Sequence, residues 1–240
     1  LNKLAEQMRL KRMQAGAISF EKLETKFLLD EDGNPIEIYF KENKAAHRLI
    51  EEFMLLANRK VAEFIGKQNF PFVYRVHDEP DPEKLRNFSE FLKKLGYNLQ
   101  THGRKKIATS INKVLADVHG KEEANMVETL AIRTMAKASY TTENIGHYGL
   151  AFTHYSHFTS PIRRYPDVIV HRLLQHYLDK GKAGDKEKIE KLCKHASNQE
   201  IKATRAERES IKYMQAKYML KRVDMNFEGI ISGVTDFGMF

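Results

Sequence analysis

The chain has 240 residues, with 40 Lys or Arg against 32 Asp or Glu, and this formal net charge of +8 favours nucleic acid or another polyanion as partner. Cys193 is the single cysteine, which excludes intrachain disulfides and cysteine-based zinc sites and favours a buried core thiol in a reducing cytoplasm. The apolar runs are too short to span a bilayer, and no signal-peptide pattern opens the chain, so we expect no membrane partner.

The first elements are a helix and a hairpin. Residues 1–15 place Leu4 and Met8, with Leu10 and Met13 as further candidates, on the apolar face of an amphipathic helix. Residues 20–40 alternate around an acidic turn at 30–35, which predicts a β-hairpin. Acids in such a turn are usually solvated, and the glutamate that ends a Ca²⁺ loop is missing here, so we expect no ion in the turn.

Helices dominate the rest of the chain. We expect, in chain order, a largely buried helix over 45–65, a strand over 72–76, a helix that Pro80 and Pro82 open and that runs to Leu95, helices over 105–118 and 121–137, extended chain and loops over 139–160, helices over 167–178 and 185–222, and strand-like alternation over 227–240.

Residues 159–167, with the sequence TSPIRRYPD, are the most informative segment. Pro161 and Pro166 fix two corners, so the backbone between them should hold a defined shape. Arg163 and Arg164 each offer a planar fork of donors that suits phosphate. Spacing alone leaves a phosphate-facing site and a solvated surface turn equally open.

Glu51 and Glu52 interrupt the apolar surface of the helix over 45–65. Adjacent helical residues point about 100° apart, so only one of the two can face the core. Ordinary boundary charges would explain the pair. Alternatively, Glu51 is a carboxylate in the wall of a site, and Asn58, seven residues on, lines the same cleft.

The histidines upstream of the arginines carry weaker signals. His147, His154 and His157 fit no standard zinc spacing, and their aromatic neighbours suit packing or base stacking better. A catalytic triad of Ser160, His171 and Asp167 can be drawn, but it lacks a nucleophile elbow. We therefore expect neither a histidine metal site nor a triad.

Taken together, these segments resemble the catalytic domain of the ribonuclease II family, and within it the bacterial ribonuclease R branch. The matching stretches are residues 50–58, 74–77, 146–150 and 157–167, followed by His171 and Arg172. The resemblance implies an α/β (α+β) fold in which helices dominate. Residues 1–225 would be the C-terminal part of the catalytic domain, and residues 226–240 would begin an RNA-binding barrel of the oligonucleotide-binding type.

The same resemblance implies a function. Family members are processive 3′-to-5′ exoribonucleases that hydrolyse single-stranded RNA to nucleoside 5′-monophosphates, with Mg²⁺ ions held by aspartates and no small-molecule cofactor. Carried over motif by motif, Arg163 would contact the scissile phosphate, Glu51 would line the same cavity near the 3′-terminal nucleotide, Phe20 would stack on the last bases, Glu207 would lie near the terminal sugar, and Arg164, Tyr165, His171 and Asn58 would shape the channel or hold the RNA backbone. A non-catalytic module that binds single-stranded RNA is the alternative.

One departure from the family pattern matters. The metal-binding aspartates of the family form a closely spaced motif upstream of the hairpin, whereas Asp30, Asp32, Asp78 and Asp81 lie in turn contexts here. Both ends of the chain look cut, and we expect the metal site to lie before Leu1. The fragment alone should therefore not hydrolyse RNA. The sequence does not reveal the oligomeric state, and the resemblance favours a monomeric parent.

Overall fold

The computed structural model describes residues 1–20, 24–41, 44–229, 234–235 and 237–239. In chain order the elements are α1 (Asn2–Gln14), β1 (Glu24–Leu29), β2 (Pro35–Lys41), α2 (Ala45–Gly66), β3 (Tyr74–Val76), α3 (Pro82–Lys94), α4 (Arg104–Val118), α5 (Ala124–Thr134), β4 (Ser139–Thr141), the 3₁₀ turn η1 (Tyr148–Leu150), α6 (Tyr165–Leu178), α7 (Lys186–Leu220), β5 (Val234–Thr235) and β6 (Gly238–Met239). Helices dominate, as the sequence predicts.

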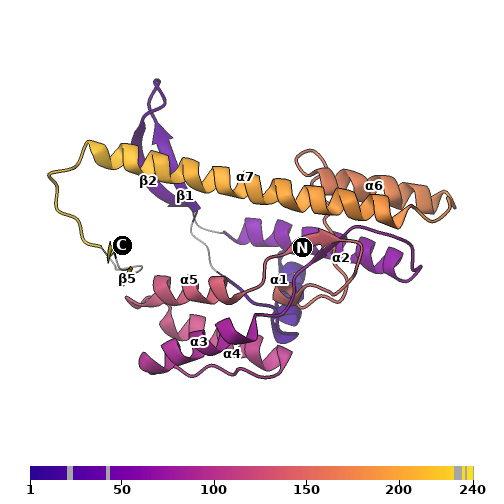
Figure 1. Ribbon diagram of the computed structural model, residues 1–240, viewed down its shortest axis with the longest axis horizontal. Coiled ribbons are helices and arrows are strands. Elements are labelled where there is room, and N and C mark those ends of the chain that lie inside the picture. Colours follow the sequence, from indigo (N-terminus) through magenta and orange to yellow (C-terminus); the bar gives the residue numbers. More distant parts are fainter. Residues whose placement is uncertain (21–23, 42–43, 230–233, 236, 240) are drawn as a thin grey trace.

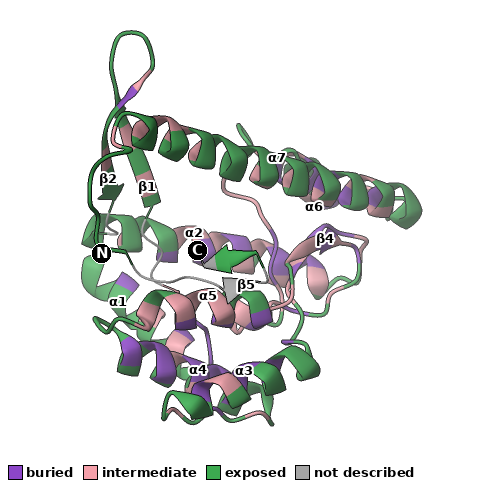
Figure 2. Ribbon diagram, turned by 60° about the vertical axis from the view of Figure 1, so that its left-hand side comes forward, coloured by how far each residue is buried: buried purple, intermediate pink, exposed green. Residues whose placement is uncertain are grey.

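Figure 1 shows α3, α4 and α5 together on one side of the molecule and α6 and α7 on the other, and the described buried hydrophobic residues form two large clusters and one small one. One core lies among α3, α4 and α5 and includes Leu92, Ile111 and Val127. The other joins the second half of α2 to β3, β4, α6 and the start of α7. Buried positions on α7 are confined to its first turns, and most of its remaining length is exposed (Figure 2). Cys193 is one of these buried positions, so the predicted core thiol is confirmed, and burial raises its pKa to about 12.

The strands form short antiparallel pairs. β1 pairs with β2, which confirms the hairpin, and the carboxylate of Asp30 holds its turn by accepting from the backbone N–H of Asn34 at 2.7 Å. β3 pairs with β4, with Arg75 opposite Tyr140, and this pair lies against α7. β5 pairs with β6 in the region predicted to be strand-like. Residues 230–233, 236 and 240 of that region lie outside the described residues.

Side-chain caps explain the starts of α3 and α7. Asp81 accepts from the N–H groups of Glu83 and Lys84 at 2.9 and 3.0 Å, directly before Pro82 at the first turn of α3. These bonds lower the pKa of Asp81. Asp185 caps α7 in the same way through Lys188 N–H at 3.1 Å.

Two details of the sequence prediction are wrong. The predicted apolar face of α1 is not its buried face: Leu4 and Leu10 are exposed, whereas Ala5 and Arg12 are buried. The helix predicted over 121–137 is shorter at both ends. Residues 121–123 form a bend and a turn instead, where Lys121 donates to the hydroxyl of Tyr97 and this hydroxyl donates to Glu123.

Candidate nucleic-acid interface

The arginine loop (residues 158–167) is held by side chains from two helices. From α2, Asn58 Oδ1 accepts from the backbone N–H groups of Phe158 at 2.9 Å and Thr159 at 3.2 Å. From α6, Asp167 Oδ1 accepts from the N–H of Ser160 at 2.8 Å. Three consecutive N–H groups therefore point inward, and residues 158–164 have a defined backbone although they lie outside the helices and strands.

Asp167 also pairs with Arg164. The guanidinium Nη2 of Arg164 lies 2.8 Å from Asp167 Oδ1, and the carboxylate is fully buried. The two arginines of the motif therefore differ: Arg164 is tied to the protein, and its charge is largely offset by Asp167. Arg164 thereby ties the start of α6 to its own loop.

Arg163 is exposed at the tip of the same loop. Its backbone N–H donates to Ser160 O at 3.3 Å, and no acidic partner for its side chain occurs among the described residues. Ile162 and Tyr165 flank it and are also exposed, Ile162 fully. The loop thus presents one uncompensated cation beside exposed apolar and aromatic side chains.

His171 lies behind the loop on α6. Its ring stacks on Phe158 with centroids 4.1 Å apart, and its Nε2 faces the carbonyl of Phe158 at 2.8 Å. The position joins His171 to the arginine loop. It also rules out the triad geometry in this arrangement, because Nε2 is directed to a backbone carbonyl and Asp167 to Arg164.

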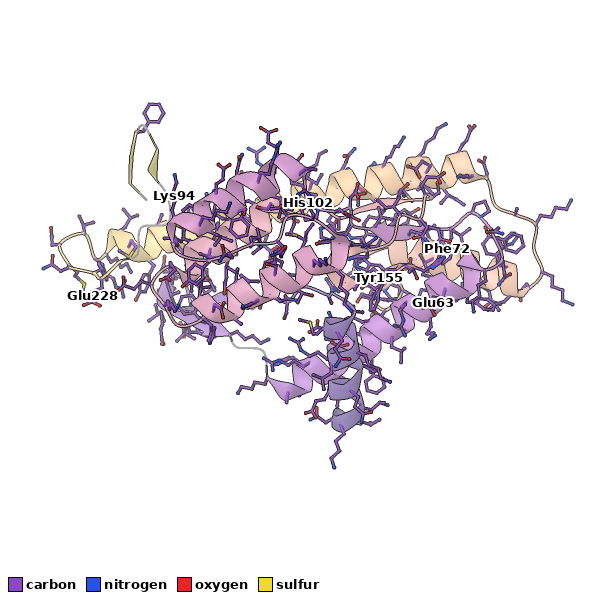
Figure 3. The ribbon with its side chains drawn as sticks, turned by 90° about the horizontal axis from the view of Figure 1, so that it is seen from below. Glu63, Phe72, Lys94, His102, Tyr155 and Glu228 are labelled. Atoms are coloured by element: carbon purple, nitrogen blue, oxygen red, sulfur yellow. The ribbon has the colours of Figure 1, made fainter. Side chains whose placement is uncertain are left out.

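A layer of neutral histidines and tyrosines packs beneath the loop. The rings follow one another from His77 to His147, Tyr155, His157 and Tyr140, with centroid separations of 5.0 to 5.6 Å. Tyr155 lies in the middle of the molecule in Figure 3. His157 Nδ1 lies 2.8 Å from the Tyr140 hydroxyl, so the neutral ring can accept that proton.

Burial and nearby positive charge keep these imidazoles neutral. Burial, reinforced by Arg164 and Arg75, lowers the pKa of His157 to about 2. Burial, with His77 beside it, lowers the pKa of His147 to about 3. The layer therefore adds no positive charge to the site near neutral pH. In the sequence only the clustering of aromatic residues pointed to it.

Glu51 and Glu52 take different places on α2. Glu52 is buried and paired with Arg12 of α1, whereas the side chain of Glu51 is about half exposed, with its Oε1 4.0 Å from Arg12 Nη2. Asn58 is buried, so the expectation that it lines a cleft beside Glu51 is wrong: its amide is bonded within the protein.

Among the described residues, Arg163, Glu51 and Phe20 line none of the cavities next to α1 and α2. These cavities, one of about 160 Å³, are lined by Glu52 rather than Glu51. Phe20 packs partly against the core of α3 to α5. Glu207 is exposed on α7, and no described contact joins it to the arginine loop.

Asn112 is a residue that the sequence prediction missed. It lies on α4, where its Oδ1 accepts from Ser19 N–H at 3.2 Å and its Nδ2 donates to Ala17 O at 2.7 Å. It therefore fixes the backbone just before Phe20. No local pattern points to it, because its partners lie more than 90 positions away along the chain.

Metal ligands and membrane spans can be assessed for the described part of the chain. Within it, no three His, Cys, Asp or Glu side chains come together as a potential metal site. The described helices also include none that is long and apolar enough to cross a bilayer.

The helix-dominated α+β fold, with the Pro-flanked arginine loop at one end of α6, is that of a ribonuclease II-type catalytic domain. The chain belongs to the RNB domain family, whose model matches residues 1–180. Ribonuclease R of Aquifex aeolicus (strain VF5) is 45% identical over 234 residues, which are 96% of this chain and 33% of that protein. Ribonuclease R of Escherichia coli (strain K12) is 37% identical over 241 residues, 95% of this chain and 30% of that protein.

Solved structures agree with this assignment. Mycoplasma genitalium RNase R in complex with ribose methylated single-stranded RNA has a TM-score of 0.91 and 30% identity, covering 100% of this chain and 38% of that one. Yeast Ssd1, a pseudonuclease, has a TM-score of 0.56 and 26% identity over 65% of this chain and 20% of that one. The chain spans about a third of the length of the curated relatives it matches.

Proposed function

We propose that this chain is part of a processive 3′-to-5′ exoribonuclease that hydrolyses single-stranded RNA to nucleoside 5′-monophosphates. The observation that carries the proposal is Arg163, an unpaired guanidinium on a loop that Asn58 and Asp167 hold in place within an RNB domain. Relatives named ribonuclease R, and the likeness to an RNase R solved with RNA, support it.

In this proposal Arg163 binds the phosphate at the point of cleavage. A fixed guanidinium stabilises the charge that develops on the phosphate oxygens, because its donors need little reorganisation during the reaction. Around it we assign Glu51 to the 3′-terminal nucleotide, Phe20 to base stacking, Glu207 to the terminal sugar, and Arg164, Tyr165 and His171 to the shape of the channel.

Mg²⁺ is the expected cofactor of the parent protein. The described residues do not fit a metal pair, because they bring together no three ligating side chains. Mg²⁺ chemistry is therefore assigned to no residue of this chain. Its ligands would come from the aspartate motif of the parent, and the chain alone should not cleave RNA. We further infer a cytoplasmic, monomeric parent that needs no small-molecule cofactor.

The direct experiment uses the full-length parent protein with 5′-labelled single-stranded RNA and Mg²⁺. We expect the labelled RNA to become shorter from its 3′ end and nucleoside 5′-monophosphates to be released. RNA carrying a blocked 3′ terminus should persist. Cleavage within the RNA, or shortening from the 5′ end, would contradict the proposal.

The second candidate function is a non-catalytic RNA-binding module. The likeness to yeast Ssd1, a pseudonuclease, supports this candidate. In that case the parent would bind single-stranded RNA with a strong salt dependence and leave it intact in Mg²⁺. Shortening of the RNA by the parent excludes this candidate. Binding without shortening supports it.

A further inference from the structure

We propose that Asn58 is a positioning residue for Arg163: it sets the backbone from which the guanidinium reaches the RNA phosphate, and it does not contact RNA. The inference rests on the proposed function of Arg163, and it replaces the expectation that Asn58 belongs to the RNA-binding surface.

The burial of Asn58 separates it from any ligand. Its side chain lies inside the protein with 3% of its surface exposed. Three of the four hydrogen bonds that an amide can make are used internally: Oδ1 accepts from Phe158 N–H and Thr159 N–H, and Nδ2 donates to the hydroxyl of Tyr155 at 3.1 Å. RNA therefore cannot reach this amide, and only one of its hydrogen-bonding positions is unused.

The same contacts fix which way the amide faces. Two backbone N–H donors require an oxygen on the loop side, and this leaves Nδ2 toward the hydroxyl of Tyr155. Tyr155 is itself held between His147 and His157, with ring centroids 5.2 and 5.6 Å away. Asn58 thus connects the buried aromatic layer to the loop, and partners on both sides hold its amide in one orientation.

Side chains hold the first residues of the loop: His171 contacts the ring and carbonyl of Phe158, and Asn58 and Asp167 bind the N–H groups. Residues 158–160 lie outside the helices and strands, and their N–H groups bond side chains. The next turn is built on this segment, since Arg163 N–H and Arg164 N–H both donate to the carbonyl of Ser160. Arg163 is four residues from Thr159, so a shift of the Asn58 contacts moves the arginine.

The chemistry of Asn58 suggests a graded series of substitutions. Asn58→Leu keeps the approximate volume and removes both acceptor and donor. Asn58→Asp keeps an acceptor for the two N–H groups, and the Tyr155 hydroxyl can turn to donate to its second oxygen. A displaced catalytic group costs on the order of 100-fold in rate, so we expect Asn58→Leu to lower kcat of the full-length parent by about that factor.

Two readouts separate positioning from a general loss of stability. KM for a short single-stranded RNA should change by less than roughly threefold in Asn58→Leu, while Asn58→Asp should restore most of kcat. In an Arg163→Ala background, Asn58→Leu should cost less than about threefold more, because both changes remove the same interaction. Tyr177→Phe is the matched control: it removes another buried side-chain bond to a loop, to Pro71 O at 2.7 Å, and should leave kcat unchanged.

The outcomes are distinct. If Arg163→Ala has no effect, the proposed function fails for that residue. If Arg163→Ala matters and folded Asn58→Leu keeps its kcat, or if the two losses simply multiply, the positioning role is overturned. If Asn58→Leu does not fold, Asn58→Ser provides the test, because its short hydroxyl cannot reach both N–H groups. A folded Asn58→Ser with unchanged kcat overturns the positioning role. If Asn58→Ser lowers kcat in the otherwise unchanged parent but not in the Arg163→Ala background, the role is supported.

Discussion

Arg12 of α1 and Glu52 of α2 form an ion pair that is buried between the two helices. Arg12 Nε lies 3.4 Å from Glu52 Oε2, Nη2 contacts Oε1, and 6% and 4% of the two side chains are exposed. A buried charge without its partner is costly, so the pair fixes how α1 lies against α2. Glu52 is thereby enclosed, whereas Glu51, 4.0 Å from the same guanidinium, stays about half exposed.

Removing one partner should destabilise the fold strongly. We expect Arg12→Ala to lower the free energy of unfolding by about 3–5 kcal/mol, because Glu52 keeps a buried, uncompensated carboxylate. The double replacement Arg12→Met with Glu52→Leu removes both charges and should recover most of that loss. Urea unfolding of the three proteins followed by circular dichroism measures the difference. A cost below about 1 kcal/mol for Arg12→Ala would show that the pair is not buried as described.

The histidine layer predicts a pH dependence of stability. His157 and His147 have folded-state pKa values of about 2 and about 3, against 6.5 for an ordinary histidine. Below pH 6.5 the unfolded chain therefore binds protons that the folded chain does not. The contribution of the two neutral histidines to the free energy of unfolding is complete above pH 6.5. It is lost as the pH falls toward 3, at up to about 1.4 kcal/mol per pH unit for each histidine.

A variant isolates this contribution. His157→Asn keeps an acceptor for the Tyr140 hydroxyl and cannot gain a proton in this range. Its unfolding free energy should vary less between pH 7 and pH 5 than that of the unsubstituted chain, whatever its absolute stability. His119→Asn, at an exposed histidine of the α4 C-terminus, is the control and should leave the slope as it was. If the unfolding free energies of the unsubstituted chain and of His157→Asn depend equally on pH, the neutral buried imidazole is contradicted.

Local pattern sufficed for the long helices. Periodic apolar residues predict α2 and a long charged stretch predicts α7, each to within about two residues, and the acidic turn predicts the β1–β2 hairpin, because these elements depend on neighbouring residues. Pairing between distant segments left no such mark. β3 and β4 are short and about 65 positions apart, and the burial of Arg12 rather than Leu10 on α1 depends on a carboxylate 40 positions away.

The site was predictable in part for the same reason. The Pro-flanked arginines identify the loop, and their chemistry identifies phosphate as the candidate ligand. Which arginine remains free could not be read from the sequence, since it depends on the burial of Asp167 against Arg164. The role of Asn58 was equally hidden, because the backbone groups that it holds are 100 and 101 positions away.

Gly146 should tolerate no side chain. Its φ is +79°, and a Cβ there would lie 2.8 Å from the carbonyl oxygen of Phe152, which accepts from His147 N–H. Gly146→Ala therefore adds a backbone clash to the left-handed strain. Gly96 has a similar φ of +83° and open space around it. We expect Gly96→Ala to cost about 1 kcal/mol and Gly146→Ala about 2–4 kcal/mol in thermal unfolding. Equal costs would mean that strain alone acts at Gly146.

Arg163 carries the last prediction. In the full-length parent, Arg163→Ala should lower the rate of RNA shortening at least ~100-fold, the scale of losing one fixed donor to a developing oxyanion. Arg163→Lys keeps the charge and loses the planar fork, so its rate should lie between that of the unsubstituted parent and that of Arg163→Ala. Stability should barely change, because the side chain is exposed and makes no described contact. Arg86→Ala, at an exposed arginine of α3, controls for the loss of one positive charge. If Arg86→Ala and Arg163→Ala slow the enzyme equally, general electrostatic attraction explains the effect and the phosphate contact of Arg163 is wrong.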